Sequence, residues 1–523
     1  VQSPTMATSL RSLCVSIALL ALALAAQSKK NEDLITSLGS ITRRHMDASS
    51  GFSSTQEYLQ SVASARRPLV VTGYDVDLSK WDLDALAKKG GGGVILDNVR
   101  RNRGSKSVFA IMTPEDQDSE GFVLRKNTTL GGLETSDTVS VITPNAENLL
   151  FNVDFNDFYA IESGPDGSME KLYWTGDLRG VAGDSLGDGK GDLWWRDFQV
   201  WDDLQVEGEV GEEVFVPMLW MSHPGVTAQT HYDKSHNWFL QLFGTKKIRL
   251  FPPSYGRYMY SYPSVHAGRK MSQIPFLDSW GGDDPTKGTI FPNATSLKSY
   301  DVLLKPGEIL YIPPYWWHSI STTDESAALS LSVVSPSWEE ALVSRAVNSP
   351  LPLRPFESKV EKRVAAQVII THVVSRMEKM GSPEIFSAFL FNDRWANLYP
   401  SLGGRRGECY GWSDGEEEEV EEVMGRLQED EELQGDMVAA AEAVAGLLND
   451  ELLSQGVRMV ALGDWIEKVA VWAVAERQGE GEPVAKFLLD CLGVDNLEIT
   501  EQYDGKPLVE DGDGRLNLKD DEL

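Results

Sequence analysis

Two short segments of the chain contain the residues best suited to bind a metal ion. His231 and Asp233 lie two positions apart in the first segment, and His318 lies in the second, much later in the chain. Two imidazoles and one carboxylate form a facial triad, which binds Fe(II) and leaves coordination positions open for reactants. A His-x-Asp pair alone is common by chance, so the prediction of a catalytic metal site depends on the elements that position these residues.

The region around these residues reads as a series of short β-strands. Apolar and polar residues alternate in runs separated by turn residues, which is typical of a sandwich or a small barrel. Residues two apart on a strand point to the same side, so His231 and Asp233 can face the barrel interior together. His318 follows a predicted strand and can complete the site from a neighbouring position. The predicted strands are 214–221, 238–243, 246–251, 302–305, 310–313 and 328–334.

Helical patterns flank the strand-rich region. Polar residues 28–65 read as a helical lead-in, and after Trp338 apolar residues recur at intervals of three and four. The acidic run between Asp414 and Asp436 reads as a solvated linker or an exposed helix face. We therefore expect an α+β fold, with a strand-rich core and a C-terminal helical region. The predicted C-terminal helices are 357–377, 436–453 and 464–478.

Composition limits the class of protein and of partner. The 523 residues are 41% hydrophobic and include 15 Trp, which indicates a globular protein with a substantial buried core. The formal net charge of −31 argues against a nucleic-acid partner, because a phosphate backbone attracts a basic surface. A simpler explanation for the acidic residues is that they keep the protein soluble.

Residues 1–27 resemble a secretory signal peptide. Arg11 precedes an apolar run over 13–26, and small residues end the run. The run is short for a membrane span. We therefore expect cleavage and no stable membrane span afterwards, and an uncleaved anchor is the alternative.

Features elsewhere in the chain agree with the secretory pathway. The acidic tail 501–523 ends in Asp-Asp-Glu-Leu, which resembles the retention address of the endoplasmic reticulum. Asn127 and Asn293 begin glycosylation sequons. Cys409 and Cys491 could form one disulfide in an oxidising lumen, or remain two buried thiols. The expected location is the lumen of the endoplasmic reticulum.

Two blocks of sequence, 231–253 and 305–320, resemble the JmjC (cupin-8-like) family of 2-oxoglutarate oxygenases. Within this family they are most similar to the asparaginyl hydroxylase of hypoxia-inducible factor, and the likeness covers about 53–338. The resemblance implies a double-stranded β-helix, or jelly-roll, core with Fe(II) bound by His231, Asp233 and His318. It also implies that 2-oxoglutarate chelates the iron. The expected divisions are 1–27, 28–65, a catalytic domain over 66–338, a helical region over 339–500 and the tail 501–523.

The resemblance also assigns residues to the co-substrate. Lys246 matches the lysine whose ammonium pairs with the distal carboxylate of 2-oxoglutarate, and Tyr173 matches a tyrosine that reaches the same carboxylate. Asn237 matches a position near the iron and the co-substrate. The family threonine aligns with Thr227 or with Thr230, and we assign Thr227. Where the family often has a polar residue on a late strand, this chain has Val333.

These assignments predict an Fe(II)- and 2-oxoglutarate-dependent oxygenase that hydroxylates a protein side chain in the secretory pathway. The main alternative is a non-catalytic JmjC-like protein that binds partners, for example as a homodimer through its C-terminal helices. A metal-binding cupin of another class, such as an isomerase without 2-oxoglutarate, is a third hypothesis, and Lys246 weighs against it.

Overall fold

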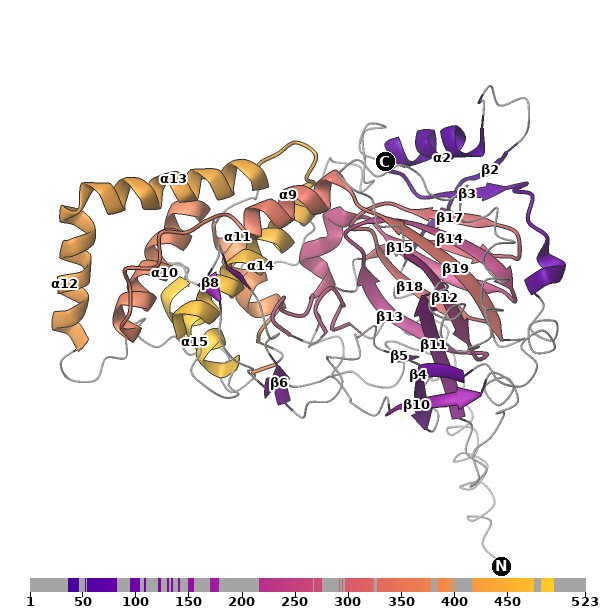
Figure 1. Ribbon diagram of the computed structural model, residues 1–523, viewed down its shortest axis with the longest axis horizontal. Coiled ribbons are helices and arrows are strands. Elements are labelled where there is room, and N and C mark those ends of the chain that lie inside the picture. Colours follow the sequence, from indigo (N-terminus) through magenta and orange to yellow (C-terminus); the bar gives the residue numbers. More distant parts are fainter. Residues whose placement is uncertain are drawn as a thin grey trace, which may run out of the picture.

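The structure, a computed structural model, has a β-rich half and a helical half that lie side by side (Figure 1). No helix among the described residues is long and apolar enough to cross a membrane. The described residues are 36–46, 52, 54–81, 95–103, 108–109, 121–123, 129–130, 133–134, 140–141, 149–154, 170–177, 216–266, 268–274, 291, 294, 297–323, 327–377, 383–396, 398–399, 416–474 and 481–492.

The β-rich half consists mainly of two facing sheets. One contains, in order, β1 (Thr36–Ser40), β16 (Lys298–Leu304), β15 (Lys246–Phe251), β18 (Trp317–Thr322), β13 (Thr227–Tyr232) and β5 (Val108–Phe109). The other contains β10 (Leu149–Asp154), β4 (Ile95–Arg103), β11 (Glu170–Asp177), β12 (Val216–Ser222), β19 (Ala328–Ser335), β14 (His236–Phe243), β17 (Ile309–Ile312), β3 (Leu69–Thr72) and β2 (Arg43–His45).

The path of the chain between the sheets is that of a jelly roll. From β16 to β19, successive strands alternate between the six-stranded and the nine-stranded sheet. Strands that are distant in sequence therefore become neighbours, and β13 pairs with β18 and β14 pairs with β19, both antiparallel. The predicted α+β fold with a jelly-roll core is confirmed.

Two apolar clusters hold the sheets in place. Phe239, Ile248, Leu250 and Leu310 belong to a cluster between the sheets, and Trp238 belongs to another on the outer face of the nine-stranded sheet. Neighbouring residues of β14 therefore enter opposite cores, as the two-residue period of a strand requires. Helix α2 (Thr55–Ser64) covers the outer cluster.

The helical half continues the core of the β-rich half. A single apolar cluster joins Tyr232 and Trp317 of the sheet to the C-terminal helices. The 3-10 helix η3 (Pro253–Met259) packs against α14 and contributes Met259 to this cluster. The helices are α9 (Trp338–Val347), α10 (Lys359–Val374), α11 (Pro383–Ala388), the π-helix η5 (Phe389–Asp393), α12 (Glu416–Glu429), α13 (Glu431–Leu448), α14 (Gln455–Val474) and α15 (Gly481–Leu492).

A buried ionic network reinforces this junction. Arg394 follows η5, and its Nη2 lies 2.8 Å from Asp464 Oδ1 and 3.2 Å from Glu467 Oε2 on α14. Trp395 Nε1 donates to Glu467, and the backbone N–H of Ser264 donates to the same carboxylate at 2.6 Å. The segment after η3 is thus attached to the helical half through buried charges.

Several predicted elements differ from the structure. The lead-in predicted as helical contains strand β1 before α2. Of the two alternatives for the acidic run, a solvated linker or an exposed helix face, most of the run forms a helix, α12, whose Val420, Val423 and Leu427 recur at helical spacing and pack on the core. The helices predicted at 436–453 and 464–478 begin earlier, at Glu431 and Gln455.

Cys491 is disulfide-bonded, and its partner lies outside the described residues. The predicted signal peptide, both sequons and the acidic tail also lie outside them.

Candidate metal centre

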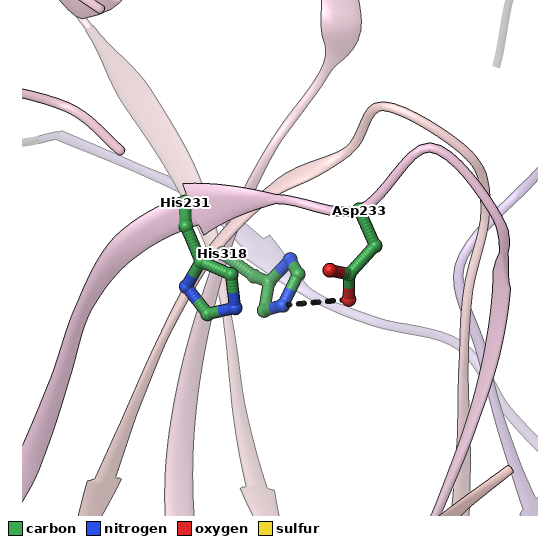
Figure 2. Close-up of side chains that lie close together, drawn as sticks. All are labelled: His231, Asp233 and His318. Atoms are coloured by element: carbon green, nitrogen blue, oxygen red, sulfur yellow. Dashed lines mark ion pairs between the residues drawn. The ribbon is translucent and has the colours of Figure 1, made fainter. Parts of the chain in front are cut away.

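The structure brings the three predicted metal ligands together. His231 on β13 pairs directly with His318 on β18, and residues opposite each other in an antiparallel pair project from the same face. Their ring centroids are 4.2 Å apart. Asp233 lies two positions after His231 and turns toward the same point (Figure 2). One ligand atom from each of the three residues lies within 4.8 Å of the others.

A β-bulge in β13 gives His231 its direction. The register with β18 shifts between Ala228 and His231, which places one extra residue in β13. Bulges are frequent beside functional sites because they turn a side chain toward a new point. The neighbouring segment holds the bulge in place, since Ser272 N–H donates to the Thr230 carbonyl and Tyr232 N–H donates to the Lys270 carbonyl.

In both imidazoles a backbone carbonyl contacts Nδ1, which leaves Nε2 as the nitrogen that can bind a metal. His231 Nδ1 lies 2.8 Å from the Gln229 carbonyl, and His318 Nδ1 lies 2.9 Å from the Trp316 carbonyl. A carbonyl can only accept, so each Nδ1 donates and each Nε2 carries the lone pair in the neutral ring. A hydrogen bond of this kind orients most histidines that bind metals in proteins. The two rings therefore fit a divalent cation.

The charges at the site match those that a metal requires. Burial, followed by the nearby His318, lowers the pKa of His231 to about 4, so this ring is neutral at pH 7. Burial alone would raise the pKa of Asp233, but the nearby His318, His231 and Lys270 outweigh it and lower that pKa. A neutral imidazole and an ionised carboxylate are the forms that coordinate metals.

Asn237 lies beside the carboxylate, as the resemblance implies. Its Nδ2 donates to Asp233 Oδ2 at 3.0 Å. The same Oδ2 lies 3.7 Å from His318 Nε2. Asn237 therefore contacts the carboxylate oxygen that faces the other ligands.

Lys246 lies at the far end of the inner face. On β15 it points to the same side as Ile248 and Leu250, and Leu250 pairs with His318. Four residues along a strand separate Lys246 from that pair, which is about 13 Å. Lys246 is only 2% exposed, its Nζ lies 5.1 Å from the centroid of the Phe239 ring, and burial lowers its pKa to about 7.

A buried amine of this kind is suited to a carboxylate ligand. Among the described residues, no carboxylate forms an ion pair with Lys246. A charged group that is buried without a partner is costly, and an anionic ligand would remove that cost. The inner face thus offers metal ligands at one end and a cation for a distal carboxylate at the other, which fits 2-oxoglutarate.

Tyr173 lies toward the Lys246 end of the barrel. It is buried, stacks on Trp220 with a centroid distance of 5.7 Å, and pairs with Ser222 in the register of β11 and β12. Ser222 Oγ lies 2.6 Å from Thr322 Oγ1, and Thr322 pairs directly with Lys246. Tyr173 thus lies toward the end of the inner face where Lys246 lies, and its contact with the co-substrate stays a prediction.

Thr227 does not join this group. Its hydroxyl lies 2.8 Å from Ser321 Oγ, and Ser321 points away from the face that carries His318 and Ile320. The alternative residue, Thr230, lies in the bulge and is buried, and its hydroxyl has no hydrogen-bond partner among the described residues. The geometry favours neither threonine as a contact for the distal carboxylate.

A family model described as a cupin-like domain matches residues 54–335, which is more than half of the chain. The chain belongs to this cupin-like, JmjC family. The family includes oxygenases that depend on Fe(II) and 2-oxoglutarate. The family expected from the two sequence blocks is therefore confirmed, and the special likeness to the asparaginyl hydroxylase stays a prediction.

Relatives from this family differ in the part that they share with the chain. It is 25% identical to tRNA wybutosine-synthesizing protein 5 of Mus musculus over 280 residues, which are 53% of this chain and 74% of that protein. It is 32% identical to Jumonji C domain-containing protein 5 of Drosophila melanogaster over 111 residues, 21% of this chain and 26% of that protein. It is 35% identical to Lysine-specific demethylase JMJ30 of Arabidopsis thaliana over 114 residues, 22% of this chain and 24% of that protein. The chain thus spans about a quarter of the two JmjC relatives.

Sequence reasoning missed several polar residues of the inner face. Ser222 and Thr322 lie beside Lys246, and Ser332 bonds to Asn237. The resemblance places Val333 at the late-strand position, but Val333 packs in the outer apolar cluster and its neighbour Ser332 faces inward. The two-residue period counted from His318 would have identified Thr322.

Proposed function

We propose that this cupin-like protein is an Fe(II)- and 2-oxoglutarate-dependent oxygenase that hydroxylates a protein side chain. One observation carries the proposal: the His231, Asp233 and His318 cluster shares an inner barrel face with Lys246, a buried amine. The cluster can bind a metal ion. The amine at the opposite end can pair with the distal carboxylate of a dicarboxylate that chelates this metal.

Each residue of the inner face has a defined task. Iron held by His231, Asp233 and His318 would, with 2-oxoglutarate and O2, supply the oxidation of a substrate C–H bond to C–OH, with succinate and CO2 as co-products. His231 and His318 present Nε2 lone pairs, and Asp233 presents a negative charge. Lys246 orients the co-substrate by pairing with its distal carboxylate, which suits a compact charge on a flexible stem. Binding, orientation and exclusion of water are the contributions of the protein.

Aromatic side chains close the back of the metal centre. Tyr232 stands between two ligands in sequence, stacks on Tyr315 at 5.3 Å and meets Trp317 edge-on at 4.7 Å. All three rings are buried. Tyr232 and Trp317 each neighbour a histidine of the cluster on a strand, so they lie on the opposite face of the sheet, in the apolar cluster shared with the C-terminal helices.

The class of substrate follows from the charge of the chain and is compared with the names of its relatives. The relatives are named for tRNA wybutosine synthesis and for lysine demethylation, so their names point to different substrates. The match of 280 residues favours tRNA as a second candidate. The net charge of −31 weighs against a polyanion and supports a protein substrate.

The experiment is an assay of succinate release by purified protein with Fe(II), ascorbate and 2-oxoglutarate. We expect turnover above background that rises with lumenal protein extract and not with tRNA, and that Asp233→Ala abolishes. Stimulation by tRNA alone would replace protein with RNA as the substrate. Absence of metal-dependent turnover with either addition would contradict an oxygenase and leave the non-catalytic alternative.

We further propose a lumenal location and a homodimer formed by the C-terminal helices. The disulfide at Cys491 and the apolar run over 13–26 support the location, because disulfides persist in oxidising compartments. Digestion of cellular protein by endoglycosidase H and light scattering of purified protein test the two proposals. Loss of mass on digestion and a dimeric mass are the expected results.

A further inference from the structure

Two similar side-chain hydrogen bonds join strands β14 and β19 inside the barrel. Ser332 Oγ donates to Asn237 Oδ1 at 2.8 Å, and Ser330 Oγ donates to Gln241 Oε1 at the same distance. Both serines are buried, with exposed fractions of 2% and 0%. Each hydrogen bond joins a hydroxyl of β19 to an amide of β14, but the N–H groups of the two amides have different partners.

Only the contact of Ser332 continues to the metal site. Asn237 Nδ2 donates to Asp233 Oδ2 at 3.0 Å, whereas Gln241 Nε2 donates to the carbonyls of Phe243 and Gly244 in the turn after β14. A chain of hydrogen bonds therefore runs from Ser332 through Asn237 to Asp233. The chain from Ser330 ends on the backbone, at the opposite end of β14.

The carboxylate of Asp233 decides which way the amide of Asn237 points, because the hydroxyl of Ser332 can either donate or accept. If the amide were rotated by half a turn, its oxygen would face the carboxylate of Asp233, and two acceptors would meet. In the observed orientation the oxygen accepts from Ser332 and the nitrogen donates to Asp233. Ser332 satisfies the oxygen of this amide and thereby anchors, from β19, the side chain whose N–H donates to the carboxylate.

Asp233 needs such a tether more than the two histidines do. It follows the last residue of β13, Tyr232, and its backbone carbonyl accepts from the Tyr315 N–H at 2.7 Å, so the backbone is held while the direction of the carboxylate depends on its side-chain partners. Its side chain is 31% exposed, while that of His318 is 1% exposed. The terminal torsion of an aspartate is broad, so the carboxylate would rotate easily without a partner.

We infer that Ser332 is a positioning residue for the metal centre, acting through Asn237 to hold Asp233 Oδ2 toward His231 and His318. The inference rests on the proposed metal site and assigns a task to the inward-facing polar residue of the late strand. Partners behind metal ligands commonly change metal affinity by 10–100-fold when they are replaced. Ser332 acts one residue further away, so we expect a loss near the lower end of this range.

The test compares Ser332→Ala with Ser330→Ala in the full chain. Each variant removes one buried hydroxyl that donates to an amide of β14, so the structural losses are matched. We measure the dissociation constant of Co(II) by calorimetry and the visible absorption of the bound Co(II), which reports ligand geometry. We expect S332A to bind Co(II) roughly tenfold more weakly, with an altered spectrum. S330A should match the wild type, and S332T should restore most of the affinity.

Equal Co(II) affinity and equal spectra in all variants would overturn the inference, as would equal losses in S332A and S330A. If S332A is too unstable to purify, Asn237→Ala carries the same comparison against S330A with the same two outcomes. The outcomes also separate this inference from the proposed function. A wild type that binds Co(II) but shows no 2-oxoglutarate turnover contradicts the function alone, whereas a wild type that binds no divalent metal contradicts both.

Discussion

Lys246 is the residue whose chemistry most depends on its surroundings. It shares β15 with Lys247, but the two side chains lie on opposite faces of the strand, and only Lys246 is buried. We expect Lys246→Ala to abolish the thermal stabilisation that 2-oxoglutarate gives the Mn(II)-loaded protein, since the distal carboxylate loses its counter-ion. Differential scanning fluorimetry measures this shift.

Lys247→Ala is the matched control, because it removes the same functional group one position away. It should keep the full stabilisation by 2-oxoglutarate. Equal shifts in both variants would show that Lys246 does not bind the co-substrate.

The pKa of Lys246 leads to a prediction about pH. Burial lowers this pKa to about 7, so most of the amine is neutral at pH 8 in the unliganded protein. A carboxylate beside the amine favours the charged form and raises its pKa. Binding of 2-oxoglutarate at pH 8 should therefore take up a proton, and affinity should fall as pH rises above 7, by up to about tenfold per unit.

Calorimetry in two buffers of different ionisation enthalpy measures this proton uptake directly. The Mn(II)-loaded protein is used, without O2, so that no turnover disturbs the heat. The control is Lys246→Ala, which should show neither proton uptake nor this dependence on pH. An affinity that is constant between pH 7 and pH 9 would contradict the proposed role of the amine.

At the scale of elements, the sequence indicated the strands better than their registers. The alternation of apolar residues is local and locates β14, β15 and β19, whereas β13 and β18, which carry His231 and His318, are not among the predicted strands. The bulge in β13 was not predictable, because it depends on pairing with a strand that is distant in the chain. A slip of one residue reverses the face of a side chain, which explains why Val333 was chosen instead of Ser332.

Charge alone does not decide the structure of the acidic run in the helical half. Its charges are compatible with a linker or with an exposed helix face, and the few apolar residues of α12, which recur at helical spacing, select the helix. The ionic network of Arg394 was not anticipated, since its members lie far apart in sequence and no motif marks them. Such long-range contacts follow from the packing of the helices, which one sequence does not reveal.

The network of Arg394 provides a prediction at this scale. Arg394 is 1% exposed and lies between the buried carboxylates Asp464 and Glu467. Replacement by Met would leave these carboxylates buried without their counter-ion, so we expect Arg394→Met to lower the free energy of unfolding by about 3–5 kcal/mol. Chemical denaturation followed by circular dichroism measures this loss.

Arg426→Met is the control, because Arg426 makes an exposed ion pair with Glu361 and is itself 42% exposed. Exposed pairs contribute about 0–1 kcal/mol, so this variant should remain close to the wild type. A similar loss in the free energy of unfolding in both variants would mean that the buried network contributes no more to stability than an exposed ion pair does.

At the scale of the whole molecule, the jelly roll and the helical half share one apolar core. Tyr232, which stands between two metal ligands, belongs to the same cluster as Leu462 and Trp465 of α14. The expected division at residue 338 therefore does not separate two independent cores. A destabilising substitution in α14 should therefore also lower the stability of the metal centre.

Leu462→Ala tests this connection. Leu462 is fully buried, so its truncation should cost about 2–5 kcal/mol, whereas Leu452 is 54% exposed and its truncation should cost little. Thermal unfolding is followed with Co(II) bound, both by far-ultraviolet circular dichroism and by the Co(II) absorption. If the halves unfold together, both signals of L462A fall at the same lowered temperature, and L452A keeps the wild-type midpoint. A Co(II) signal that persists to the wild-type temperature in L462A would show instead that the barrel holds its metal independently of the helices.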